Sequence, residues 1–89
     1  MPITQEQIEK IVSLAKPYGA VRLILFGSVL EEPNEARDID IACDGVAGWE
    51  LYSLAAKLEE ELHMPLDIVP LNPPSRFTKH IERKGKVIL

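Results

Sequence analysis

The chain has 89 residues, of which 46% are hydrophobic and 27% charged, and its formal net charge at pH 7 is −4. This composition is typical of one globular domain, and the acidic balance argues against a protein whose main task is to bind the nucleic acid backbone. No apolar run approaches the about 20 residues of a membrane helix, and no signal-peptide pattern is present, so we expect a cytoplasmic protein with a single domain over residues 1–89.

Two elements are predicted in the first part of the chain. Thr4–Gln7 has the pattern of a capping box, and apolar residues then recur at helical spacing until Pro17 disfavours helical geometry in Lys16. Val21–Phe26 is nearly all apolar and predicts a buried strand. The polar, acidic segment Val29–Arg37 that follows predicts a loop or a single helical turn.

The remainder of the chain predicts alternating strands and helices. We expect a strand at Asp38–Cys43, a helix at Leu51–Leu62 and a second strand at Leu66–Leu71. A short final strand is expected at Val87–Leu89. Between the last two strands, Ser75 is placed to cap a further helix, and Gly85 suits the residue after its end. The expected fold class is α/β, with a small mixed sheet of about four strands flanked by helices, and a right-handed crossover makes the second and third strands parallel.

Three carboxylates are the first candidates for chemistry. Asp38 and Asp40 are two residues apart on a strand, so both side chains project from the same face, while Ile39 and Ile41 project into the core. If the second and third strands are parallel neighbours, Asp67 lies beside this pair. Clustered carboxylates repel one another unless a cation is present, and hard oxygen ligands suit Mg²⁺. Two such ions can bridge the attacking and leaving oxygens of a phosphoryl displacement.

A glycine and a serine at the end of the first strand complete the candidate site. Gly27 lets the backbone approach a phosphate closely, and Ser28 can donate its hydroxyl and its N–H to phosphate oxygens. The segment Val29–Arg37 then returns the chain to the same end of the sheet. We therefore expect Gly27 and Ser28 to bind phosphate.

These motifs resemble a known signature. Leu25–Ser28, followed by nine residues and then Asp38–Ile41, resembles the Gly-Ser…Asp-x-Asp signature of the polymerase β-like nucleotidyltransferase superfamily. Leu66–Val69 looks like the third carboxylate strand, and the bare domain looks like the minimal nucleotidyltransferase branch, which includes antitoxins. The resemblance implies the nucleotidyltransferase fold over nearly the whole chain.

The resemblance also implies a role for each residue of the site. Asp38 and Asp40 would bind two Mg²⁺ ions. Asp67 would bind the ion nearer the acceptor and help to deprotonate the attacking hydroxyl. Gly27 and Ser28 would hold the β- and γ-phosphates.

The sequence departs from the family pattern directly after Ser28. The family commonly has arginine there, whereas Val29–Glu32 carries no cationic residue and two acidic ones. Arg37, Arg76 and Lys79 are the candidates to supply the missing charge, although Arg76 and Lys79 also fit a solvated helix face.

Five other side chains have simpler interpretations. Cys43 is expected to fill the core, so no disulfide within the chain and no cysteine-based zinc site is predicted. His63 and His80 are interpreted as ordinary surface residues. Trp49 and Tyr52 are interpreted as packing or interface residues rather than as a platform for a nucleotide base.

Two functions of different classes follow from the resemblance. The first is a Mg²⁺-dependent nucleotidyltransferase that moves AMP from ATP to a hydroxyl of a protein acceptor, as the antitoxin of a HEPN/MNT toxin–antitoxin pair. The alternative is a catalytically degenerate binding module that neutralises its partner by contact, which the acidic Val29–Arg37 segment favours. Transfer to RNA or a small molecule is less favoured, because 89 residues leave no room for an acceptor-binding domain. A core of this size also favours a homo-oligomer or another protein partner.

Overall fold

The computed structural model describes residues 3–35 and 37–89. In this part of the chain, four strands form one mixed sheet. The strands are β1 (Arg22–Phe26), β2 (Ile39–Asp44), β3 (Leu66–Pro70) and β4 (Lys86–Val87). Their order is β3-β2-β1-β4, in which β2 and β3 are parallel and the other two pairs are antiparallel. The structure thus confirms the predicted small mixed sheet and the parallel pair.

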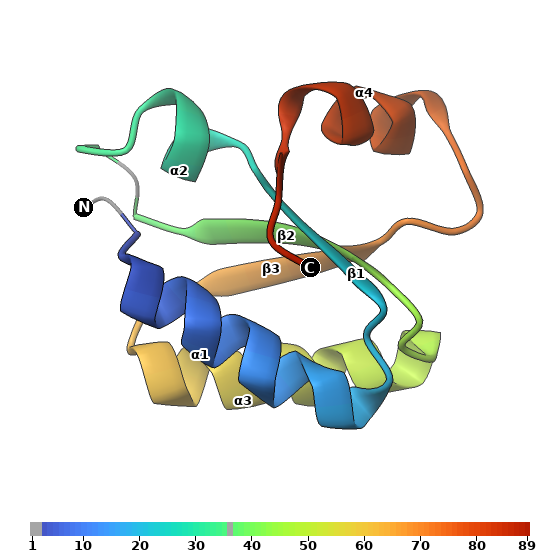
Figure 1. Ribbon diagram of the computed structural model, residues 1–89, viewed down its shortest axis with the longest axis horizontal. Helices are drawn as coiled ribbons and strands as arrows, with labels where there is room; N and C mark the ends of the chain where they lie inside the picture. Colours follow the sequence, from blue (N-terminus) through green and yellow to red (C-terminus); the bar gives the residue numbers. More distant parts are fainter. Residues whose placement is uncertain (1–2, 36) are drawn as a thin grey trace.

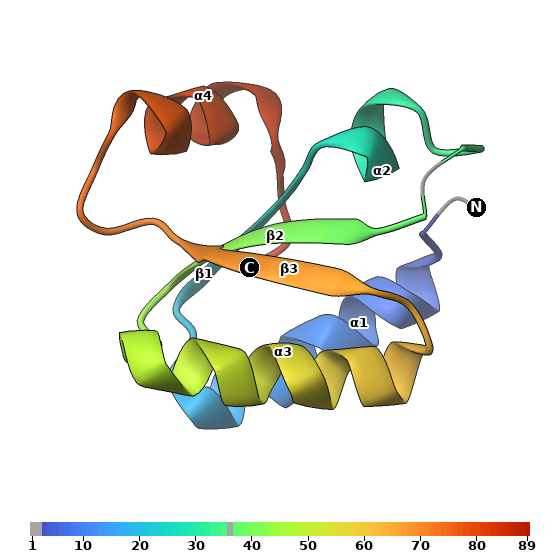
Figure 2. The same ribbon diagram turned by 180° about the vertical axis from the view of Figure 1, so that it is seen from behind.

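Helices cover both faces of this sheet. They are α1 (Gln5–Ala15), α2 (Ser28–Glu31), α3 (Gly48–Leu62) and α4 (Arg76–Lys84), with a 3₁₀ turn, η1 (Lys16–Tyr18), after α1. Figure 1 and the reverse view in Figure 2 place α1 and α3 on one face and α4 on the other, with α2 above one end of the sheet. None of the helices in the described residues has both the length and the apolar character of a membrane span.

The capping signals that the sequence predicts are present. Thr4 accepts a hydrogen bond from the Gln7 N–H while the Gln7 side chain accepts one from the Thr4 N–H, which makes a complete capping box at the start of α1. Ser75 and Thr78 form the same reciprocal pair at the start of α4. Both helices therefore begin at the residues that the sequence pattern indicates.

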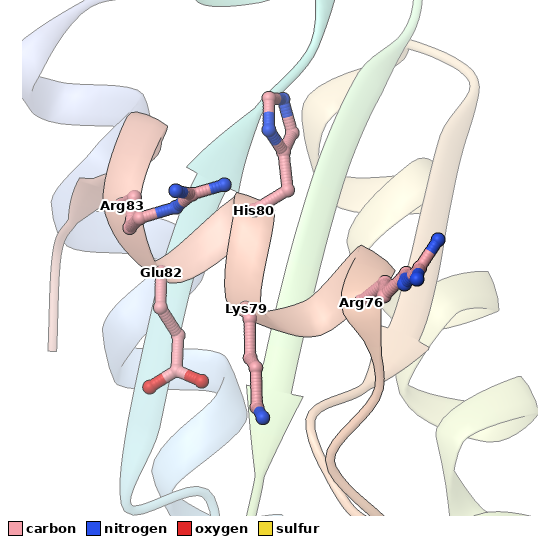
Figure 3. Close-up of a pocket in the computed structure, with 5 residues that line it drawn as sticks. All are labelled: Arg76, Lys79, His80, Glu82 and Arg83. Atoms are coloured by element: carbon pink, nitrogen blue, oxygen red, sulfur yellow. The ribbon is translucent and has the colours of Figure 1, made fainter.

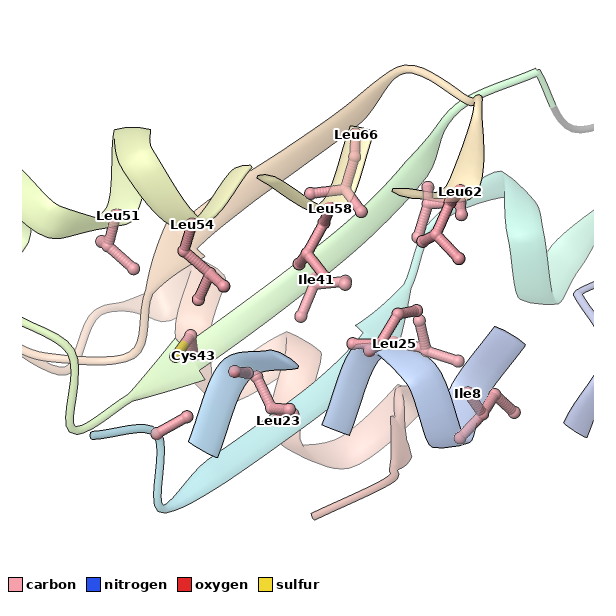
Figure 4. Packing of buried hydrophobic residues seen from close by; sticks show 14 of the residues in the cluster. Ile8, Leu23, Leu25, Ile41, Cys43, Leu51, Leu54, Leu58, Leu62 and Leu66 are labelled. Carbon is pink, nitrogen blue, oxygen red and sulfur yellow. The ribbon is translucent and has the colours of Figure 1, made fainter. Parts of the chain in front are cut away.

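Alternate residues of the strands point to different helices, because the side-chain period of a strand is two. The larger core lies between the sheet and α1 and α3, and Figure 4 shows its packing. Its strand residues include Leu23, Leu25, Ile39, Ile41, Cys43 and Leu66. A smaller core lies under α4, and its buried residues are Ile24, Ala42, Leu71 and Ile81.

The end of the chain differs from the sequence prediction in two respects. The last regular strand is Lys86–Val87 rather than Val87–Leu89, and Ile88 and Leu89 instead exchange hydrogen bonds with Leu23 beyond the regular ladder. Gly85 has φ −77° and ψ 172°, so it is not the left-handed residue that a helix C-terminus often requires. Glycine is needed there for space: a Cβ would lie 2.7 Å from the backbone carbonyl oxygens of both Ile81 and Leu25.

Two aromatic residues of α3 lie outside both cores. Trp49 is 75% exposed and Tyr52 is 81% exposed, so neither packs within this chain. Of the two interpretations made from the sequence, packing is therefore wrong and a role at an interface remains. His63 and His80 are exposed and Cys43 is buried, as expected.

Candidate functional site

Two of the predicted carboxylates lie side by side on the α4 face of the sheet. Asp40 in β2 is in register with Phe26 of β1 on one side and with Asp67 of β3 on the other. Ile39 and Ile41 are fully buried in the opposite core, which fixes the direction of Asp40. Asp67 belongs to the outermost strand and is exposed, whereas Asp40 is half-buried in the middle of the sheet.

The electrostatics of Asp40 reflect this position. Burial raises the pKa of the Asp40 carboxyl above its usual value, and the negative charges of Asp67 and Asp38 raise it further. Asp38 lies just before β2 and is exposed, yet its charge still acts on Asp40. The three carboxylates therefore share one region of mutual repulsion, and a bound cation would relieve it.

Gly27 brings the end of β1 against the same carboxylate. Its backbone has φ 77° and ψ −151°, a conformation that is almost restricted to glycine. A Cβ at this position would lie 2.6 Å from Oδ2 of Asp40. The glycine thus permits the left-handed turn and also leaves room for the Asp40 carboxylate beside the backbone.

The turn after Gly27 sets the position of Ser28. The Gly27 carbonyl accepts hydrogen bonds from the N–H groups of Leu30 and Glu31, at 3.0 and 3.1 Å, which close the single helical turn α2. Val29 is 3% exposed and packs into the larger core, so it anchors this turn to the sheet. Ser28 is therefore held at the start of the turn, directly after Gly27.

The three carboxylates offer a chemically suitable set of ligands for Mg²⁺, which prefers oxygen donors. Within residues 3–35 and 37–89, no three His, Cys, Asp or Glu side chains stand close enough together to hold a metal ion as they lie. Asp40 and Asp67 are in register in neighbouring strands, but the three carboxylates do not converge closely enough to bind one metal ion in these side-chain conformations. Both outer carboxylates are exposed, so their side chains can rotate towards a cation, and the residues fit such an ion.

The lysine that shares a pocket with Gly27 is not one of the residues suggested by the sequence. A pocket of about 260 Å³ between α2 and α4 is lined by Gly27, Glu31, His80 and Lys84, among others. The sequence offers one signal for this face: Phe77, His80, Ile81 and Lys84 are spaced as i, i+3, i+4 and i+7 on a helix.

Two of the candidates made from the sequence line a different depression. Arg76 and Lys79 lie with His80, Glu82 and Arg83 on the outer side of α4. Figure 3 shows His80 pointing towards the carboxyl end of β1, whereas Lys79 and Glu82 point towards its beginning. There, the Glu82 carboxylate forms an ion pair with Arg22, in which Oε2 of Glu82 lies 2.8 Å from Nη1 of Arg22. Of the sequence candidates, Arg37 is exposed just before Asp38, and it lines neither depression.

Comparison with known proteins agrees with the observed fold. A sequence model of the family "Polymerase beta, Nucleotidyltransferase" matches residues 9–89. No curated protein matches the chain.

Three solved structures illustrate the likeness. The first is a structure of the tri-AMPylated Shewanella oneidensis HEPN toxin in complex with MNT antitoxin, one chain of which is matched at 25% identity and a TM-score of 0.76, over 98% of this chain and 72% of that chain. A toxin–antitoxin structure with AMP-PNP is matched at 26% identity and a TM-score of 0.78, over 92% and 72%. A protein provisionally assigned as a minimal nucleotidyltransferase is matched at 31% identity and a TM-score of 0.72, over 91% and 88%.

Proposed function

The chain belongs to the polymerase β nucleotidyltransferase family, and on this premise we propose that it transfers AMP from ATP to a hydroxyl of a protein acceptor, in a Mg²⁺-dependent reaction. The observation that carries the proposal is the row formed by Gly27, Asp40 and Asp67 across three neighbouring segments on one face of the sheet. This row would place a turn that can bind phosphate beside two carboxylates that can hold a metal ion, and positioning and charge neutralisation supply most of the catalysis in phosphoryl transfer.

In the proposed mechanism, Asp38, Asp40 and Asp67 hold the metal, and two ions are expected. Bound Mg²⁺ would neutralise charge on the phosphates and make the acceptor hydroxyl more acidic. Gly27 and Ser28 hold the β- and γ-phosphates through backbone N–H groups and the serine hydroxyl. A bond forms between the acceptor oxygen and the α-phosphorus, and the bond from that phosphorus to the bridging oxygen breaks, so that pyrophosphate leaves.

Asp67 is the residue best placed to receive the proton of the acceptor hydroxyl. It lies on the exposed edge strand, and it also lines a groove of about 270 Å³ with Tyr52, Ile68 and Pro70 between α3 and β3. A large acceptor can reach this edge, whereas Asp40 is half-buried between two strands. Asp67 would therefore act on the acceptor, while Asp40 acts on the nucleotide.

The acceptor that we propose is a tyrosine of a HEPN-type toxin, and the chain would be its antitoxin. The support is the likeness to an MNT antitoxin whose HEPN toxin carries AMP groups, together with the likeness to a toxin–antitoxin structure that holds AMP-PNP. The exposed Trp49 and Tyr52 are further surface for such a protein partner.

The test is the intact mass of a HEPN toxin that is encoded beside the chain and co-expressed with it. We expect mass increments of whole AMP units with the wild type and none with the triple variant Asp38→Asn, Asp40→Asn, Asp67→Asn. Asp67→Asn alone should bind ATP at millimolar concentration yet fail to transfer AMP. If the toxin stays unmodified while the triple variant still neutralises it in cells, the chain acts by contact and the enzymatic proposal fails.

A further inference from the structure

The pocket between α2 and α4 adjoins the candidate site through Gly27. Gly27 lines it, and the backbone of the same residue lies against the Asp40 carboxylate. Phe26, the residue in register with Asp40, lines it as well. A phosphate chain that begins at Asp40 and passes Gly27 therefore enters this pocket next.

Helix α4 is fixed above the end of β1 by apolar contacts. The ring of Phe77 meets that of Phe26 edge to face, with centroids 5.7 Å apart and planes at 84°. Ile81 is 1% exposed in the smaller core, one turn further along the same side of the helix. These anchors hold the next residue of this helical face, Lys84, beside the pocket.

Two charged side chains line the pocket, Lys84 from α4 and Glu31 from α2, and His80 adds an imidazole ring that can donate a hydrogen bond. The ion pairs within residues 3–35 and 37–89 are Lys10–Glu61 and Arg22–Glu82, so Lys84 makes none there. Its ammonium group is thus available to an anion, while Glu31 opposes an anion in the same pocket.

We propose that Lys84, with His80 beside it, binds the β- and γ-phosphates of the nucleoside triphosphate. Lys84 thereby supplies, from the far end of the chain, the positive charge that the segment 29–32 lacks. This inference rests on the proposed function, because it assigns a further binding residue to the same nucleotide. The pocket accepts a polyphosphate despite Glu31, whose carboxylate weakens the binding.

The chain offers a matched control for Lys84 on the same helix. Lys79 is also an exposed lysine of α4, but it lines the outer depression and points towards the beginning of β1 (Figure 3). Replacement of either lysine by glutamine removes one positive charge from α4. Only replacement of Lys84 removes that charge from the pocket that contains Gly27.

The experiment is titration calorimetry with ATP and with AMP, each with saturating Mg²⁺, on the wild type and four variants. We expect Lys84→Gln to weaken ATP binding about fivefold, the size of one partly exposed ion pair, and to change AMP binding less than about twofold. Lys79→Gln should change neither affinity, and Glu31→Gln should strengthen ATP binding. Lys84→Arg should retain most of the ATP affinity, which separates the charge from any effect on folding.

Two results would overturn the inference while the proposed function stands. In the first, Lys84→Gln binds ATP as tightly as the wild type does. In the second, Lys84→Gln and Lys79→Gln weaken ATP binding equally, which would indicate only a general effect of net charge. Failure of the wild type to bind ATP at millimolar concentration would instead overturn the proposed function, and the inference with it.

Discussion

The two faces of the sheet differ in what covers them and in what their side chains do. On the face under α1 and α3, β2 presents Ile39, Ile41 and Cys43 to a continuous apolar core. On the face under α4, the same strand presents Asp40 and Ala42, and four of the residues that the structure describes form the smaller buried core. Because successive side chains of a strand point to opposite faces, β2 contributes to the apolar core on one side and presents a candidate catalytic carboxylate on the other.

The largest effect is expected on the α1/α3 face. Leu58 in α3 is fully buried, so Leu58→Ala should lower the free energy of unfolding by about 3 kcal/mol, through lost burial and a residual cavity. Urea denaturation measures this loss, and Leu58→Met, which preserves most of the volume, should lose less than about 1.5 kcal/mol. A loss below about 1 kcal/mol for the alanine variant would mean that this face does not carry the stability of the fold.

The next largest effect is expected at Gly27, whose substitution should change both stability and ATP binding. Gly27→Ala should cost about 1–3 kcal/mol of stability, since alanine disfavours φ 77° and its Cβ would press on the Asp40 carboxylate. The same variant should lose Mg²⁺-dependent ATP binding. Gly48→Ala is the control, because a Cβ there meets nothing within 4 Å, and it should change neither property. Normal ATP binding by Gly27→Ala would argue against phosphate contact at this turn.

A smaller effect is expected at the start of α4. Ser75→Ala removes the side chain that accepts the Thr78 N–H, so it should cost about 1 kcal/mol. Ser75→Gly should cost only a few tenths of that, since glycine is tolerated at this position. Thermal unfolding followed by circular dichroism compares the two, and equal loss in both variants would show that the cap is not the cause.

The smallest stability effect is expected at Asp40, and it has the opposite sign. Asp40→Asn removes a half-buried charge that Asp67 and Asp38 repel, so without metal the variant should melt slightly above the wild type. Asp44→Asn removes a charge from the same strand, outside this trio, and should bring no such gain. A clear loss of stability in Asp40→Asn would contradict the view that this side chain is kept for binding.

The core should also shield the only cysteine. Burial raises the pKa of the Cys43 thiol to about 11, so at pH 8 roughly one thiol in a thousand is ionised. We expect iodoacetamide to modify the folded chain at pH 8 far more slowly than the chain in urea. Equal rates would show that the end of β2 opens readily.

Much of the division of the sheet into an apolar face and a face with carboxylates could be predicted from the sequence, because the signals for it are local. The alternation in Asp38–Cys43 predicted the direction of Asp40, and the capping box at Thr4–Gln7 and the N-cap at Ser75 predicted the starts of α1 and α4. Asp67 needed only one topological rule, the parallel crossover, to be placed beside Asp40. The assignment of metal and phosphate to these residues remains a prediction.

What could not be predicted depends on packing between distant segments. Lys84 reaches the neighbourhood of Gly27 only because α4 packs over the end of β1, a contact between residues more than fifty positions apart. The need for glycine at Gly85 likewise comes from the approach of Ile24 and Leu25, which no local pattern reveals. The sequence therefore suggested Arg37, Arg76 and Lys79 instead, of which Arg76 and Lys79 line a different depression of α4.

The most direct test of the account is titration calorimetry of ATP binding with Mg²⁺ and with EDTA, on the wild type and on Asp38→Asn with Asp40→Asn. We predict Mg²⁺-dependent binding by the wild type, none by the double variant, and a double variant at least as stable as the wild type. Equal Mg²⁺-dependent affinity in the two proteins would contradict the assignment of the α4 face as the nucleotide site.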